Sequence, residues 1–98
     1  MPFIYYFRPA SMTSQKYDQC IARLAAAGAN DPAGRLYHAA HGSGDQLHVI
    51  DVWDSHDAFE QFGKTLVPIL QELGVDPGTP EVIPVHNLIA GPVPVKTV

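Results

Sequence analysis

Apolar and polar positions along the chain follow two periods, which predict an alternation of strands and helices. Residues 3–8 form an apolar run rich in aromatic residues, and Pro9 ends it, so we expect a central strand there. After Thr13 or Ser14, either of which suits a helix N-cap, apolar residues recur three and four positions apart. This spacing predicts a helix that ends before Gly28. Its expected inner face consists of Tyr17, Cys20, Ile21 and Leu24.

A hairpin is expected in the middle of the chain. Strands are predicted at about 35–42 and at 47–53, separated by a few small and polar residues. Gly44 followed by Asp45 suits the two central positions of a type II′ turn. This turn sets the register of the two strands and places His41 opposite His48, His38 opposite Asp51, and Leu36 opposite Trp53.

A second helix follows the third strand directly. Ser55 or Asp54 provides the N-cap, and the apolar residues Phe59, Phe62 and Leu66 recur at helical spacing. Pro68 has no N–H and would clash with the carbonyl of Lys64 in a straight helix. We therefore expect a break after about 63–65 and a short second piece ending near 74.

The element order βαββαβ predicts an α+β, ferredoxin-like fold with an antiparallel sheet and both helices on one face. The last strand is expected at 81–89, so a single domain spans 1–90. Prolines at alternate positions restrict 91–98 to an extended C-terminal tail. Because the strands are apolar on both sides, the helix-free face is expected to pack against a second copy.

Composition narrows the partners and the location. Hydrophobic residues make up 46% of the 98 residues and charged residues 16%, and the net charge is −4. The six basic residues form no stripe, so no nucleic-acid partner is expected. The chain shows neither a signal-peptide pattern nor an apolar run of membrane-helix length, which favours a cytoplasmic protein with no membrane partner. The single cysteine, Cys20, reads as core.

The pattern Trp53-x-Ser55 followed by Ala58-Phe59-x-x-Phe62 resembles the antibiotic-biosynthesis-monooxygenase (ABM) group of dimeric α+β barrel proteins. The resemblance implies a homodimer that uses no metal or flavin cofactor and binds an electron-rich aromatic molecule, which itself activates oxygen. It also implies that Trp53 lines a cavity between sheet and helices. Further wall residues would be Tyr5 or Tyr6, Phe7, Phe59 and Phe62. As an alternative, these aromatic side chains only fill the core.

His38 and Asp51 are the expected catalytic pair. An aspartate in an apolar strand needs a partner, since an unpaired buried carboxylate is costly. The carboxylate would fix the imidazole tautomer and prepare His38 as a general base. The alternative is a purely structural hydrogen bond, and a register shift of one residue would separate the pair.

The other histidines give weaker signals. His86 on the last strand is three strand spacings from His38 in a 4-1-3-2 order, so it would line a separate pocket or an interface. His38 and His41 are three apart on one strand and point to opposite faces, so no metal site is predicted.

Three functions remain open. The first is a cofactor-independent monooxygenase acting on a small aromatic or polyketide-like molecule. The second is an isomerase or cyclase of the same fold that uses the His38–Asp51 base. The third is a non-enzymatic ligand-binding or stress-associated module.

Overall fold

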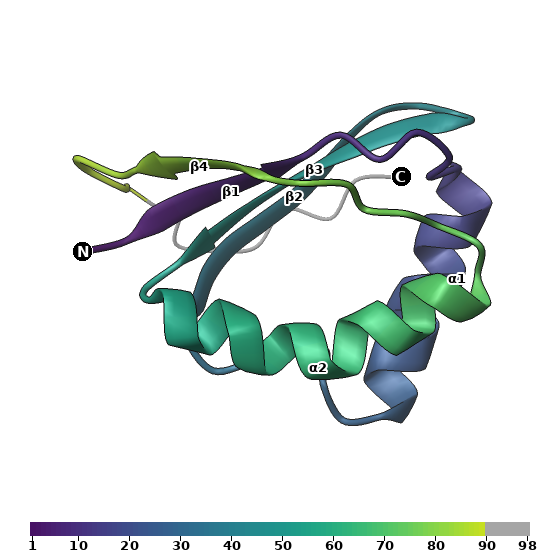
Figure 1. Cartoon of the computed structure of the whole chain (residues 1–98), viewed down its shortest axis with the longest axis horizontal. Helices are drawn as coiled ribbons and strands as arrows, with labels where there is room; N and C mark the ends of the chain where they lie inside the picture. The colour runs from purple at the N-terminus through teal and green to yellow at the C-terminus, as the bar shows by residue number, and fades with distance from the viewer. Residues whose placement is uncertain (90–98) are drawn as a thin grey trace.

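A computed structural model describes residues 1–89 of the chain (Figure 1). The order of elements is the expected βαββαβ. The elements are β1 (Phe3–Phe7), α1 (Ser14–Ala26), β2 (Arg35–Ser43), β3 (Gln46–Trp53), α2 (His56–Glu72) and β4 (Glu81–Pro84). None of the helices in the described part has the length and apolarity needed to cross a membrane.

The four strands form one antiparallel sheet in the order β2-β3-β1-β4. This order is the predicted one. Both helices lie on the same side of the sheet and enclose the interior with it, as Figure 1 shows. The prediction of a ferredoxin-like α+β fold is therefore confirmed.

The β2–β3 hairpin confirms the predicted turn but not the whole register. Gly44 has a φ of +49°, and Asp45 has no positive φ, as a type II′ turn requires. His38 pairs with Asp51, as expected. Nearer the start of β2, however, Trp53 pairs with Arg35 and not with Leu36, so the predicted Leu36–Trp53 pair is wrong. A bulge between Arg35 and Tyr37 inserts one extra residue there.

Helix α1 begins as its sequence predicts. The Thr13 hydroxyl accepts a hydrogen bond from the Lys16 amide at 3.1 Å, and Gly28 follows the helix with a φ of +72°. Cys20 and Leu24 are buried. Ile21 is 37% exposed and lies at the edge of the inner face, where it lines the interior cavity described below.

Helix α2 runs unbroken from His56 to Glu72 with Pro68 inside it, so the predicted break is wrong. Pro68 and Lys64 are both exposed, and the carbonyl that loses its intrahelical partner therefore faces water. Core residues on both sides of Pro68, including Phe62 and Leu70, hold the two halves of the helix against the same interior.

Strand β4 ends at Pro84, five residues before the predicted end at Ile89. Its partner β1 begins at Phe3, which pairs with Pro84. Beyond that pair a single backbone hydrogen bond joins the two segments, from the Val85 N–H to the Pro2 carbonyl at 2.9 Å. Pro84 also lacks the N–H that a longer ladder would need. The predicted tail 91–98 lies outside the described residues.

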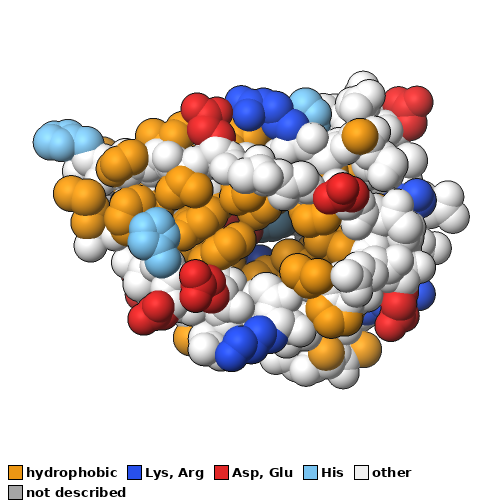
Figure 2. Space-filling view, in the orientation of Figure 1, with side chains coloured by type: hydrophobic (Ala, Val, Ile, Leu, Met, Phe, Trp, Pro, Cys, Tyr) orange, Lys and Arg blue, Asp and Glu red, His pale blue; other side chains and the backbone are white. Residues whose placement is uncertain are grey.

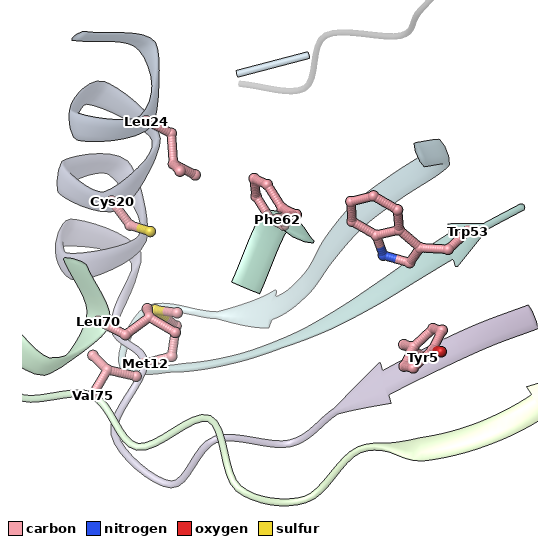
Figure 3. Close-up of a cluster of buried hydrophobic side chains, with 8 residues drawn as sticks. All are labelled: Tyr5, Met12, Cys20, Leu24, Trp53, Phe62, Leu70 and Val75. Atoms are coloured by element: carbon pink, nitrogen blue, oxygen red, sulfur yellow. The ribbon is translucent and has the colours of Figure 1, made fainter. Parts of the chain in front are cut away.

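The core lies between the sheet and the two helices (Figure 3). Each side of this interior contributes large side chains, and Trp53 from β3 is the largest that is fully buried. The buried cluster consists of Tyr5, Met12, Cys20, Leu24, Trp53, Phe62, Leu70 and Val75.

Candidate functional site

A cavity of about 70 Å³ lies between α1, α2 and the helix-facing side of the sheet. Most of its wall is apolar, and its polar groups come from β2 and β3. Figure 2 shows a hollow between the sheet layer and α2 with hydrophobic side chains around its mouth. Its apolar wall includes Phe7, Met12, Ile21, Phe62, Leu66 and Leu70, and its polar wall is formed by Arg35, His38 and Asp51.

His38 and Asp51 meet at this cavity, as the sequence predicted. They oppose each other across β2 and β3, and His38 Nδ1 lies 2.5 Å from Asp51 Oδ1. Asp51 is only 5% exposed. Since a buried carboxylate needs a donor, His38 carries its proton on Nδ1 and donates it to Asp51. This leaves the lone pair of His38 on Nε2.

The Tyr17 hydroxyl is hydrogen-bonded to His38 Nε2. The tyrosine oxygen lies 2.6 Å from that nitrogen, and the two rings are nearly parallel at 5°. Burial raises the pKa of the Tyr17 hydroxyl above its ordinary value, and the negative charge of Asp51 adds to this. The hydroxyl is therefore protonated at neutral pH, and with the His38 proton on Nδ1 it donates to Nε2. Tyr17, His38 and Asp51 form one hydrogen-bonded chain that can relay a proton.

Arg35 brings a positive charge to the same wall. Its guanidinium carbon lies 5.5 Å from the centre of the Phe62 ring, and its Nη2 donates to the Asn30 carbonyl at 3.2 Å. Its charge lowers the pKa of Tyr17, opposing burial and Asp51. The cavity thus combines an apolar wall with one cation, one carboxylate and one imidazole.

Trp53 lies behind this wall. It is 0% exposed and is not among the residues that line the cavity. Its ring packs against Phe62 at 5.3 Å between centroids and against Phe59 at 5.9 Å. Phe62 does line the cavity, so of these predicted wall residues the structure brings Phe62 to His38 and Asp51. The indole Nε1 is buried and finds no hydrogen-bond partner among residues 1–89.

Tyr5 and Phe59 form a neighbouring aromatic group on the same face of the sheet. Their rings stack at 4.1 Å between centroids, and the Tyr5 hydroxyl contacts His56 Nδ1 at the start of α2. His56 in turn stacks on Phe3 at 4.0 Å. Neither Tyr5 nor Phe59 reaches the cavity wall.

Tyr6 and His86 are placed away from the cavity as well. Tyr6 points to the helix-free face, where its hydroxyl lies 2.9 Å from His41 Nε2 and the Arg8 guanidinium lies 4.0 Å above its ring. His86 is exposed in the segment after β4. The structure therefore separates both residues from His38. Within residues 1–89, no three histidine, cysteine or acidic side chains gather closely enough to hold a metal ion.

Two residues of this site were not singled out from the sequence. The sequence pattern assigns Tyr17 only to the inner face of a helix, although a tyrosine there needs a partner for its hydroxyl. Arg35 is one of six basic residues that form no stripe along the sequence. The available signal is the position of Arg35 at the start of the strand that carries His38. That strand pairs with the strand that carries Asp51.

Comparison with known proteins identifies the fold. The sequence matches no protein-family model, and a search of curated proteins finds no match. Among solved structures, SnoaB, a cofactor-independent oxygenase from Streptomyces nogalater, is similar with a TM-score of 0.56 and 18% identity, over 92% of this chain and 96% of SnoaB. A protein from Chloroflexus aurantiacus J-10-fl, named for antibiotic biosynthesis monooxygenase, is similar with a TM-score of 0.52 and 19% identity, over 92% and 97% of the two chains.

The similarity covers nearly the whole of all three chains. The protein therefore has the ferredoxin-like α+β fold found in ABM-type monooxygenases, as the Trp53-x-Ser55 pattern and its neighbours predicted. At this level of identity, the likeness establishes the fold, and the chemistry has to be argued from the cavity.

Proposed function

We propose that this protein is a homodimeric, cofactor-independent monooxygenase that acts on a small, electron-rich aromatic molecule. The observation that carries the proposal is the hydrogen-bonded chain Tyr17–His38–Asp51 at the wall of an apolar cavity. The similarity in fold to a cofactor-independent oxygenase supports the same reading.

The hydrogen-bonded side chains Tyr17, His38 and Asp51 supply the base that this reaction needs. A hydroxy-aromatic substrate gives up its proton to His38 Nε2, either directly, by replacing the Tyr17 hydroxyl, or through that hydroxyl. Asp51 stabilises the imidazolium that results. The electron-rich anion can then react with molecular oxygen.

The atoms and electrons balance without an external reductant. A methylene carbon beside the activated ring loses two hydrogens and gains one oxygen atom, becoming a carbonyl, and the second oxygen atom leaves as water. The carbon gives up four electrons, and the oxygen molecule accepts four. This chemistry favours anthrone-like substrates, in which a methylene is activated by phenolic rings.

The size of the cavity favours a compact substrate. Its volume of about 70 Å³ is roughly half the ~150 Å³ of a protein cavity known to hold benzene. A ring-sized ligand would therefore extend into the open mouth or displace flexible wall residues such as Met12 and Leu66. A polycyclic substrate would place only its reacting ring against His38.

Oxygen consumption with 1,8-dihydroxyanthrone tests the proposal. The wild-type protein is expected to accelerate oxygen uptake above the spontaneous rate in matched buffer, with one labelled atom from ¹⁸O₂ in the product. His38→Gln is expected to remove about 10²-fold or more of the acceleration. His48→Gln, on the helix-free face, serves as the control and should retain it.

The other outcomes separate the remaining functions. Proton exchange or ring closure in a carbonyl substrate without oxygen uptake would identify an isomerase or cyclase. Saturable binding of aromatic molecules with no turnover would identify a ligand-binding module. Either result would overturn the monooxygenase proposal.

A further inference from the structure

Arg35 differs from the other two arginines in its surroundings. Arg8 and Arg23 are paired with Glu81 at 3.3 Å and with Glu72 at 2.7 Å. Within residues 1–89 the Arg35 guanidinium forms no ion pair with a carboxylate, and its single hydrogen bond goes to a neutral carbonyl. It is half-buried and lines the cavity. A positive charge in such a place is costly unless an anion is available to it.

The contacts of Arg35 leave most of its hydrogen-bonding capacity unused. A guanidinium carries five N–H donors in a planar fork, and one nitrogen here is committed to the Asn30 carbonyl. The guanidinium also lies over the Phe62 ring, which fixes it beside the apolar wall. A ligand ring lying along Phe62 would therefore present its substituents to Arg35.

We propose that Arg35 binds an oxygen anion of the ligand, so that the cavity takes a hydroxy-aromatic molecule in its ionised form. This deepens the proposed function and rests on it for treating the ligand as a substrate. The binding assignment itself concerns only the cavity and its charges.

The charge balance of the wall supports this assignment. With neutral His38, the charges of Arg35 and Asp51 cancel. If the ligand hydroxyl gives its proton to His38, the new imidazolium and the ligand anion also cancel, and the site remains neutral. Without Arg35 the same transfer would create an anion in a wall that already has a net negative charge, which is unfavourable in apolar surroundings. Arg35 thus provides the positive charge that keeps the site neutral when His38 takes the ligand proton.

The remaining ionisable groups nearby do not change this balance. Tyr17 is neutral because its pKa is raised, and burial likewise raises the pKa of the Cys20 thiol, which keeps it neutral. Arg35 is therefore the cation on this wall that is free to meet a ligand anion.

The test uses 4-nitrophenol, whose anion and neutral form differ in visible absorbance, and 4-nitroanisole, a neutral molecule of similar shape. In the wild-type protein we expect saturable binding of both, with the pKa of bound 4-nitrophenol lowered by about 1 unit. Arg35→Gln should abolish that shift and weaken binding of the anion about tenfold, while leaving the affinity for 4-nitroanisole unchanged. Arg35→Lys should retain most of the shift.

Arg23→Gln is the matched control, because it removes the same charge from the exposed surface of α1. Arg23→Gln should leave the affinities for both ligands and the pKa of bound 4-nitrophenol unchanged. The proposal is overturned if the wild-type protein does not bind 4-nitrophenol, if the bound phenol keeps its solution pKa, or if Arg23→Gln has the same effect as Arg35→Gln. Because no turnover is measured, anion binding without oxygen uptake would refute only the proposed function. Oxygen uptake without the pKa shift would refute only the role of Arg35.

Discussion

His38 and Asp51 face each other across the β2–β3 pair, with the imidazole Nδ1 2.5 Å from a carboxylate oxygen that is almost completely buried. The opposite nitrogen of the same ring accepts from Tyr17. The two bonds together define one neutral tautomer of His38, and the role of His38 as a base at Nε2 depends on that tautomer.

The first prediction is that a substitution at Asp51 reverses the tautomer of His38. Replacing Asp51 with Asn substitutes an amide that can donate to Nδ1, so the proton of His38 should move to Nε2 and be donated to the Tyr17 oxygen. Two-bond ¹H–¹⁵N correlation spectra distinguish the two tautomers directly. We expect the Nδ1–H form in the wild-type protein and the Nε2–H form in Asp51→Asn, together with loss of any base-dependent activity.

His41 is the internal reference for this experiment. It lies on the helix-free face, where it contacts Tyr6, and its ring signals should be the same in both proteins. An unchanged tautomer at His38 in the Asp51→Asn protein would show that the carboxylate does not control it.

The second prediction concerns alkaline pH. Burial raises the pKa of the Cys20 thiol above its ordinary value of 9.0 and of the Tyr17 hydroxyl above 10.0. From each ordinary value upward, the unfolded chain loses the proton before the folded protein does. The free energy of unfolding should therefore be constant with respect to these groups below about pH 9 and fall as pH rises further.

Urea unfolding between pH 8 and pH 11 measures this loss. Cys20→Ala should flatten the part of the decline that begins near pH 9. Tyr17→Phe should reduce the part that begins near pH 10 without removing it, because burial also raises the pKa of Tyr5 above 10.0. Parallel curves for all three proteins would contradict the assignment of these groups.

The local sequence was sufficient to predict the His38–Asp51 pair. A two-residue turn at Gly44-Asp45 fixes the register of the strands on both sides, and only the bulge after Arg35 changes it farther from the turn. The contact of Tyr17 with His38 could not be derived in this way. It depends on how α1 is rotated and placed against the sheet, which is set by packing across the whole core.

The same distinction explains the two errors in element boundaries. Pro68 argues locally for a helix break, but core contacts on both sides of it outweigh that preference. In β4, apolar residues continue beyond Pro84, but the partner strand does not. Trp53 illustrates the limit for sites: its strand position predicted the correct face, while the side chain that reaches the cavity from that region is Phe62.

The third prediction concerns assembly. On the helix-free face, Tyr37 is 48% exposed and Ile83 is 37% exposed, beside the half-buried Ile4 and Ile50. We expect this face to pack against a second copy, giving a sedimenting species of about twice 10.6 kDa. Tyr37→Glu should weaken the dimer at least about tenfold, because it introduces a charge into an apolar contact.

Val67→Glu is the matched control for the assembly experiment, since Val67 is similarly exposed but lies on α2. It should leave the sedimentation unchanged. A wild-type protein that sediments as a monomer at micromolar concentration would rule out the interface.

The last prediction compares Trp53 with Phe62. Trp53 is fully enclosed, so Trp53→Phe leaves a void and should lower the free energy of unfolding by about 1–3 kcal/mol. The loss should fall toward the lower end, because the change also removes an indole N–H with no partner in the described part of the chain.

The affinity for 4-nitroanisole should fall more in Phe62→Leu than in Trp53→Phe. Phe62 lines the cavity, so Phe62→Leu removes a stacking surface for the ligand ring and should weaken binding about tenfold, which corresponds to ~1.4 kcal/mol. Trp53→Phe should leave binding within about threefold of wild type, because Phe62 lies between the indole and the cavity. Isothermal titration measures both affinities without relying on the fluorescence of the only tryptophan. A larger loss of affinity in Trp53→Phe than in Phe62→Leu would mean that the ligand reaches the indole, and that the cavity opens toward Trp53 when it is occupied.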